Sequence, residues 1–232
     1  FLLTFALSGL AAYWLGVELT GRRDAGWIAG LAFAFAPYRM DQLAHIQVLA
    51  SFWMPVALLS LHRYYRDGHA RWLLLFGGAT AMQGLSNGYY LLFFPVLVVL
   101  WVLWFTPNEG WWRKVGAVGL SGALGSLIVV PILLKYRAVH DSLGLTRSLL
   151  EIESYSADVT GLVSASSYLS VWSVLDGFRS PEGQLFPGLT VAALFALALW
   201  RVTWWPRGRE PVLLRVLRVV VTATALLFVV GL

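Results

Sequence analysis

The feature that most constrains the fold is a series of long, continuous apolar stretches separated by short polar connections. The first stretch, FLLTFALSGLAAYWLGVEL at residues 1–19, carries a single charged side chain. A membrane core about 30 Å thick is crossed by about 20 apolar residues in a helix, and a backbone inside it must satisfy its own hydrogen bonds. Because the apolar residues run on without the alternation of a half-buried strand, the sequence predicts an all-α chain of membrane-spanning helices.

The apolar stretches predict a polytopic transmembrane bundle of about eight helices with one extramembrane loop region on its outer side. Residues 1–134 are expected to hold about six helices, residues 135–186 an outer loop with short helices, and residues 187–232 two more helices. Structureless connections beyond about 15 residues are uncommon, so the long loop is expected to fold as a small lid. The expected spans are 2–18, 25–40, 43–62, 72–86, 88–105, 113–134, 187–204 and 212–231.

Charge is scarce in this chain and unevenly distributed among the connections. Only 12% of the residues are charged, whereas a soluble domain carries about 25%. Of the 17 Lys and Arg residues, 12 fall in the connections after the first, third, fifth and seventh stretches. Membrane proteins keep such an excess on the cytoplasmic side. We therefore interpret the net charge of +5 as an orientation signal in a membrane, with the lipid bilayer as partner and no nucleic acid.

The second and third stretches are separated by APYRMDQLAHIQ, residues 36–47, the first of three polar segments expected on the outer side. Ionisable groups at membrane depth are costly and mark candidate sites. Asp41 and His45 are four residues apart, which on one helical face would set a carboxylate beside a proton-accepting imidazole. The alternative is structural, with Asp41 capping a helix and His45 at the interface. The candidate substrate-binding residues here are Arg39, Asp41, His45 and Gln47.

The second outer segment, LSNGYY at residues 85–90, interrupts an apolar run. One interpretation is a tight turn between antiparallel helices, in which Asn87 and Gly88 supply positive φ angles. The other is a sugar-binding element, in which the Asn87 amide forms hydrogen bonds and the rings of Tyr89 and Tyr90 stack on a sugar. The sequence leaves both open, so Asn87, Tyr89 and Tyr90 are also candidate substrate-binding residues.

The third outer segment is the long loop at residues 135–186, which begins with basic residues. Arg137 and Arg147 are candidates for binding the phosphate of a lipid carrier, because guanidinium groups form paired hydrogen bonds with such oxyanions. The alternative is an amphipathic surface helix whose charges pair with one another. We expect the three outer segments to converge on one outward-facing cavity.

Several kinds of catalytic and metal site lack support in the sequence. There is no cysteine, which excludes disulfides and thiolate-bound metals. No glycine-rich phosphate loop, HExxH zinc motif or GxSxG nucleophile turn occurs. The small residues in GGATA (77–81) and GLSGALGS (119–126) are expected to permit close packing between helices.

The order of several segments resembles bacterial GT-C superfamily membrane glycosyltransferases, including the YfhO-like branch. In the first half the resemblance is carried by APYRMDQLAHIQVLASFWMPVALL and MQGLSNGYY. In the second half it is carried by EIESYSADVTGLVSASS and EGQLFPGLTVAALFALALW. The resemblance runs along most of the chain, and the order of the motifs is more specific than any one of them.

This resemblance implies an inverting transfer of a sugar from a polyprenyl-phosphate carrier to a saccharide, lipid or protein acceptor on the outer face. In that family the general base is usually an acidic residue in the first outer loop, and Phe1 follows the expected position of that loop. We therefore expect an interior fragment with its base upstream, and we assign no catalytic residue. Some members of the family hold a divalent metal with acidic residues, and the resemblance implies no other cofactor.

Two other classes of function are alternatives to sugar transfer. A transporter or flippase of a lipid-linked or polar solute would carry ionisable groups or broken helices near the middle of the bilayer, often in repeats. The expected spans carry almost no charge in their interiors, which favours chemistry at the outer surface. The other alternative is a non-catalytic membrane scaffold, in which Asp41, His45 and Arg147 would each be dispensable for function.

Overall fold

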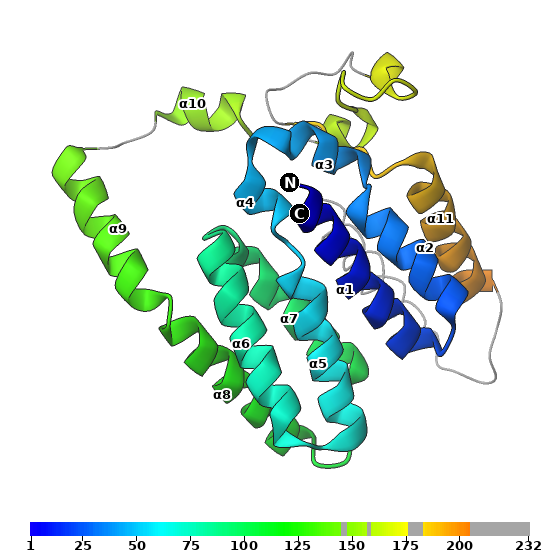
Figure 1. Cartoon of the computed structure of the whole chain (residues 1–232), viewed down its shortest axis with the longest axis vertical. Coiled ribbons are helices and arrows are strands. Elements are labelled where there is room, and N and C mark those ends of the chain that lie inside the picture. The colour runs from blue at the N-terminus through cyan, green and yellow to red at the C-terminus, as the bar shows by residue number, and fades with distance from the viewer. Residues whose placement is uncertain (145–147, 157–158, 176–182, 205–232) are drawn as a thin grey trace. The chain divides into compact units, whose positions relative to one another are not determined.

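The computed structural model describes residues 1–144, 148–156, 159–175 and 183–204, and these are entirely helical apart from turns and connections (Figure 1). No strand occurs in these ranges, which confirms the all-α class. The elements are α1 (Leu2–Thr20), α2 (Arg23–Ala34), α3 (Pro37–Asp41), η1 (Gln42–Ala44), α4 (Ile46–Leu49), α5 (Trp53–Asp67), α6 (Ala70–Ser86), α7 (Tyr90–Phe105), α8 (Trp111–Leu127), α9 (Val130–Leu143), α10 (Leu149–Ser154), η2 (Val159–Val163), η3 (Ser173–Leu175) and α11 (Leu189–Trp204).

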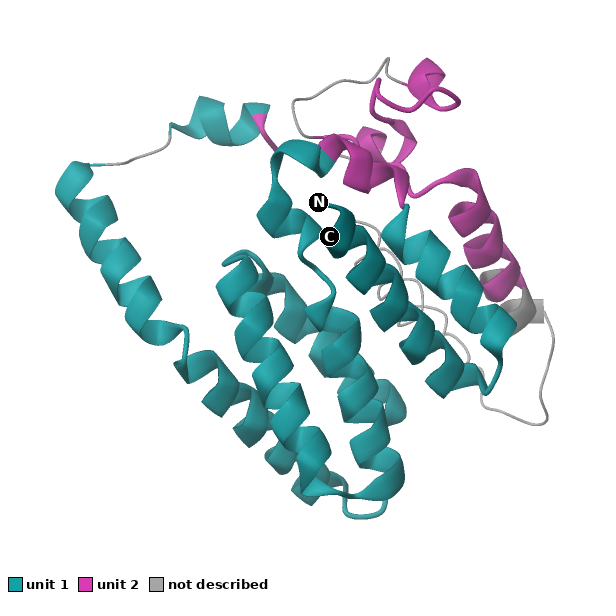
Figure 2. Ribbon diagram, in the orientation of Figure 1, with its two compact units in different colours: residues 1–35, 42–154 teal, residues 36–41, 155–232 magenta. Residues whose placement is uncertain are grey.

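The chain divides into two compact units (Figure 2). Unit 1 comprises residues 1–35 and 42–154, and unit 2 comprises residues 36–41 and 155–232. In unit 1, α1 packs against α2 and α5, α5 packs against α6, and α6 packs against α8 (Figure 1). The turns after α1, α5 and α7 lie at one end of this unit, and the segment before α5 and the turn after α6 lie at the other (Figure 1).

Glycine lets α1 and α2 pack closely as an antiparallel pair. A Cβ added at Gly30 would lie 2.7 Å from the Gly9 carbonyl oxygen, and one at Gly26 would lie 2.9 Å from the Tyr13 carbonyl oxygen. The turn between the two helices is possible because Gly21 adopts a left-handed conformation, with φ of 69°, that caps α1. The apolar run predicted α1 well, since the expected span 2–18 falls within it.

Small residues also join α6 to α8, as the sequence predicted from GGATA and GLSGALGS. A Cβ at Gly77 would lie 2.8 Å from the Ser121 carbonyl oxygen, and a Cβ at Gly125 would overlap the backbone of Gly77. The Ser121 hydroxyl donates a hydrogen bond to the Leu73 carbonyl across the same contact. The close packing of helices expected at these two segments is therefore confirmed.

The Gly125→Ala substitution is expected to lower the free energy of unfolding by about 1.5 kcal/mol, because the added methyl must push α8 away from α6. Gly119→Ala, in the same helix, is the matched control. An added Cβ at Gly119 meets no atom within 4 Å, so its better helix propensity should leave stability unchanged or raise it. Detergent-denaturation curves followed by circular dichroism would measure both, and equal effects of the two variants would contradict this packing.

The expected span 43–62 is wrong as a single helix. The chain instead forms η1 and α4, leaves helical geometry at residues 50–52, and starts α5 at Trp53. Pro55 lies in the first turn of α5, where a proline interrupts no intrahelical hydrogen bond because the first backbone N–H groups of a helix have no partner within it. The interruption keeps the polar segment before α5 as a short connection with its own packing.

The expected span 113–134 is also divided, because α8 ends at Leu127 and α9 begins at Val130 after a bend of 47°. Pro131 cannot donate a hydrogen bond to the carbonyl of Leu127, four residues before it, which accounts for the break. The second helix then continues to Leu143, so the long outer loop begins with nine helical residues. The expected spans 72–86, 88–105 and 187–204 match α6, α7 and α11 within a few residues, and 212–231 lies outside the described residues.

Among the described residues, α1 is the one helix long and apolar enough to cross a membrane, and α8 with α9 adds a second if the bent pair is counted together. The helices α7 and the Leu189–Ala198 part of α11 are apolar but shorter. The all-helical architecture of the described residues is thus established.

Unit 2 brings part of the long loop into a small folded region. The backbone N–H of Leu185 donates to the Gly161 carbonyl at 2.8 Å, and that of Phe186 donates to the Ser164 carbonyl at 3.1 Å. Phe186 packs edge-on against Trp172, with ring centroids 5.1 Å apart. Within the same unit, a Cβ added at Gly188 would lie 3.3 Å from the Pro37 ring of α3. The segment 159–186 therefore folds around its own small core where it is described.

Candidate functional site

The polar segment before α5 is fastened to the α6–α7 turn by two side chains. The Gln83 amide nitrogen donates to the Ala50 carbonyl at 3.3 Å, and the Tyr90 hydroxyl donates to the Val48 carbonyl at 3.0 Å. Between these two carbonyls Leu49 is fully buried. The segment 45–50 and the turn 87–90, forty residues apart in sequence, thus lie together at one end of unit 1. We call residues 45–50 and 83–90 the polar end of unit 1.

The α6–α7 turn has a different geometry from the one its sequence predicts. Asn87 is extended, with φ of −156°, and Gly88 is not among the glycines with positive φ, so the predicted positive angles are wrong. The turn is instead held by the Asn87 side chain, whose carbonyl oxygen accepts the Tyr89 backbone N–H at 3.0 Å. Asn87 is buried by this role, whereas the Tyr89 ring is 62% exposed.

The candidate residues at the polar end differ in accessibility. Tyr90 is 4% exposed and is committed to the Val48 carbonyl, so its predicted stacking on a sugar is not available in this conformation. Gln47 and Tyr89 are exposed, and His45 is half-buried. Among the candidate residues at this end, a ligand could therefore reach His45, Gln47 and Tyr89.

Asp41 and His45 do not lie on one continuous helical face, so that part of the sequence prediction is wrong. The helix α3 ends at Asp41, a 3-10 turn follows, and the His45 backbone has φ of −118° and ψ of 72°, outside helical geometry. Four-residue spacing brings side chains together only on a continuous α-helix. Arg39, which is 4% exposed, and Asp41 belong to unit 2, whereas His45 belongs to unit 1.

The candidate phosphate ligands lie farther along the chain. Arg137 is on α9, with its side chain 82% exposed and its Nε 3.8 Å from an Asp141 carboxylate oxygen. The pairing within α9 fits the alternative of an amphipathic surface helix. Arg147 lies outside the described residues. The convergence of all three outer segments on one cavity therefore stays a prediction.

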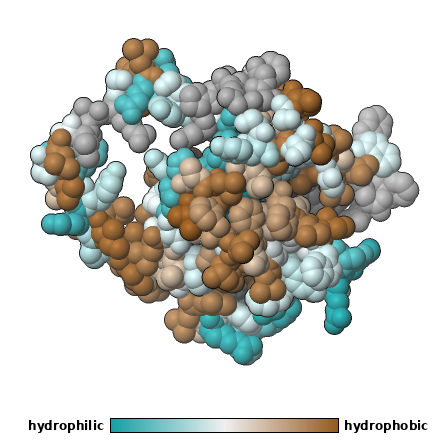
Figure 3. Space-filling view, turned by 45° about the horizontal axis from the view of Figure 1, so that its top comes forward, coloured by the Kyte–Doolittle hydropathy of each residue, from teal (hydrophilic) through white to brown (hydrophobic). Residues whose placement is uncertain are grey.

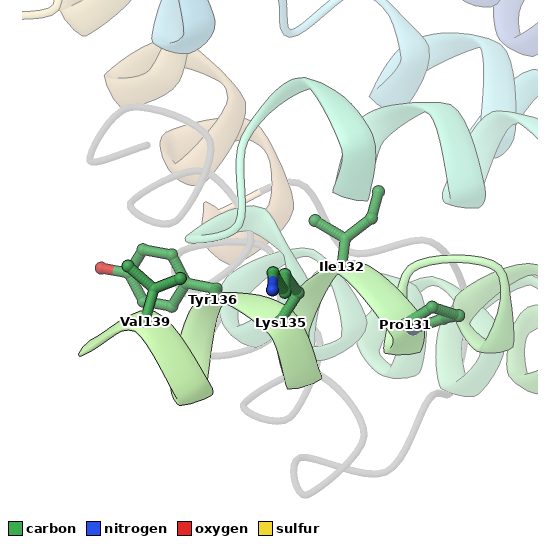
Figure 4. Close-up of a pocket in the computed structure, with 5 residues that line it drawn as sticks. All are labelled: Pro131, Ile132, Lys135, Tyr136 and Val139. Atoms are coloured by element: carbon green, nitrogen blue, oxygen red, sulfur yellow. The ribbon is translucent and has the colours of Figure 1, made fainter. Parts of the chain in front are cut away.

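One face of α9 forms a shallow hollow beside Arg137. Pro131, Ile132, Lys135, Tyr136 and Val139 line a volume of about 440 Å³ (Figure 4). All five come from α9, so the hollow is an open surface rather than an enclosed pocket. Its apolar floor and its one ammonium group could hold a chain with an anionic end.

Sequence reasoning missed Gln83, the residue that joins the two segments. It is 1% exposed, and no donor within the described part of the chain reaches its amide oxygen. The available signal in the sequence was a glutamine within the apolar stretch that forms α6. A polar side chain at such a position needs a hydrogen-bond partner, because burying it without one is costly. No group of three or more His, Asp or Glu side chains in the described residues could hold a metal.

Comparison with curated proteins and with solved structures found no match. A family model matches the whole chain, residues 1–232, and its description is a domain of unknown function, DUF6311. A match over the full length shows family membership. The chain belongs to the DUF6311 family.

Proposed function

We propose that this protein is an integral-membrane glycosyltransferase that moves a sugar from a polyprenyl-phosphate carrier to an acceptor at the outer face. The observation that carries the proposal is the polar end of unit 1, where segment 45–50 is fastened to the α6–α7 turn. The opposite end carries the basic turns after α1, α5 and α7. A polar end facing outward and a basic end facing the cytoplasm agree with the positive-inside rule.

Exposed apolar side chains support placement in a bilayer. Leu74 on α6, Leu92 on α7 and Trp27 on α2 are each more than 60% exposed. Figure 3 shows broad apolar areas on one face of the molecule. Contiguous apolar surface of this extent is uncommon on soluble monomers and marks contact with lipid or with another protein. We propose that these helices, with α1 and the bent α8–α9 pair, form the multi-pass bundle of about eight spans expected from the sequence.

Exposed side chains at the polar end could bind the sugar during transfer. His45 and Gln47 can hydrogen-bond sugar hydroxyls, and the Tyr89 ring can stack on a sugar face. A guanidinium such as that of Arg137 can stabilise the charge that develops on the departing carrier phosphate. Removing the proton of the acceptor hydroxyl needs a base, and the proposal assigns that role to no residue of this chain.

The test is sugar transfer by the full-length protein, reconstituted with radiolabelled polyprenyl-phosphate sugars. His45→Ala is expected to lower kcat/KM about tenfold, the loss of one or two hydrogen bonds to substrate. The matched control is His69→Ala, an exposed histidine before α6 at the opposite end of unit 1, which should leave transfer unchanged. Arg137→Gln is expected to lower kcat/KM at least as much as His45→Ala does, because the hydrogen bond that it removes involves a charged group.

Two outcomes would overturn the proposal. Transfer that is equally impaired by His45→Ala and His69→Ala would separate the activity from the polar end. No transfer with any donor, together with movement of labelled lipid across the bilayer, would instead identify a flippase.

A further inference from the structure

The opposite end of unit 1 contains a network of arginines and carboxylates between α1, α5 and α6. The Glu18 side chain, 7% exposed, accepts a hydrogen bond from Arg63 Nε at 2.9 Å and pairs with Arg66 through its other oxygen. Arg66 also donates to the Asp67 carboxylate at 2.7 Å. This hydrogen bond is the main cause that lowers the pKa of Asp67 below its usual value.

Trp72, in the first turn of α6, has two guanidinium groups close to its ring. The guanidinium carbon of Arg63 is 4.9 Å from the Trp72 ring centroid, and that of Arg71 is 4.8 Å from it. The Trp72 indole N–H donates to Asp67 at 3.3 Å, which fixes the ring. Cations at this distance are attracted by the ring face.

The charges of this network do not balance. Two carboxylates, Glu18 and Asp67, are shared by Arg63 and Arg66. Among the described residues, no carboxylate oxygen lies within 4.0 Å of Arg71, whose side chain is exposed. The excess positive charge therefore resides on Arg71, beside an indole ring that is already oriented.

The neighbouring turns extend this basic and aromatic surface. In the first turn of α8, Trp112 is 82% exposed and precedes Arg113 and Lys114. The turn that carries them lies at the same end of unit 1 as Arg71 (Figure 1). Exposed tryptophan together with Arg and Lys is the composition of a membrane–water interface.

We propose that Arg71, held over the Trp72 ring, binds the phosphate of an anionic phospholipid in the leaflet that this end faces, which rests on the membrane placement proposed above. A phosphodiester without a headgroup cation would supply the negative charge that Arg71 lacks, and the guanidinium can donate two hydrogen bonds to it. The cytoplasmic leaflet is the one rich in anionic lipid. A zwitterionic headgroup would add its own cation close to Arg63 and Arg71.

The experiment is native mass spectrometry of the full-length protein in detergent, with equimolar phosphatidylglycerol and phosphatidylcholine. The wild type is expected to retain phosphatidylglycerol about fivefold over phosphatidylcholine, the preference worth one cation near an anionic surface. Arg71→Gln should reduce this ratio to near one. The matched control is Arg22→Gln, which removes the same charge from the same end of unit 1. Arg22 is already paired with Asp24, so the ratio should be retained.

If the ratio fell equally in both variants, the lipid preference would depend on net charge alone, and the proposed site would be overturned. A wild type without preference would overturn it as well. Flotation with pure phosphatidylcholine vesicles tests the membrane placement separately from the Arg71 site. Protein that fails to insert into these vesicles contradicts the membrane placement, whereas inserted protein without a headgroup preference contradicts the Arg71 site alone.

Discussion

Replacing Glu18 with glutamine is expected to lower the free energy of unfolding by about 3 kcal/mol. The Glu18 carboxylate is buried and serves two arginines of α5, so the substitution leaves Arg63 without its compensating charge. Breaking a buried ion pair by removing one partner costs about 3–5 kcal/mol, and the partial exposure of Arg63 places the effect at the lower limit. Unfolding in detergent, followed by circular dichroism, would measure the change.

The control for Glu18 is Asp24→Asn at the same end of unit 1. Asp24 pairs with Arg22, and the hydrogen bond from Arg22 lowers the pKa of Asp24 to about 2. Both side chains are more than half exposed, so their pair is screened by solvent and its loss should not change the unfolding curve measurably. A Glu18 variant as stable as the Asp24 variant would show that the network does not join α1 to α5.

Helices whose apolar runs are uninterrupted could be predicted from the sequence. The stretches that became α1, α6 and α7 have no proline near their middle except Pro95, and each runs as one helix. Hydropathy alone did not indicate where the divided stretches are interrupted. The sequence predicts one span over residues 43–62, yet a new helix starts at Trp53, two residues before Pro55. A proline lies in the first turn of the helix after both interruptions, whereas Pro95 lies inside the continuous helix α7, so proline alone does not predict a break.

The candidate site was predicted in part. The sequence located polar groups at residues 45–47 and 87–90, and the structure brings these two segments together. It could not distinguish the exposed Tyr89 from the buried Tyr90, because adjacent aromatic residues differ only in the direction that the turn gives them. It also gave no indication that Glu18 pairs with arginines on α5, since that contact depends on how α1 packs against a helix 45 residues away.

The double variant Gln83→Leu/Tyr90→Phe is expected to speed amide exchange in segment 45–50 about seventyfold. The two side chains provide the hydrogen bonds to the Ala50 and Val48 carbonyls, and each carbonyl left without a partner costs about 1–1.5 kcal/mol. A loss of about 2.5 kcal/mol in the free energy of local opening corresponds to that factor. The backbone amides of Val48, Leu49 and Ala50 are protected by bonds within the segment and would report the opening by mass spectrometry.

The matched control, Gln47→Leu/Tyr89→Phe, changes the exposed neighbours and should leave exchange in segment 45–50 as it is. Equal acceleration by both double variants would mean that the segment is held by its apolar contacts, with Leu49 as the anchor. If the expected difference is found, the position of His45 depends on α6 and α7, because the bonds from Gln83 and Tyr90 are what tie its segment to them. A ligand that binds at His45 would then stabilise those bonds and slow exchange at the same three amides.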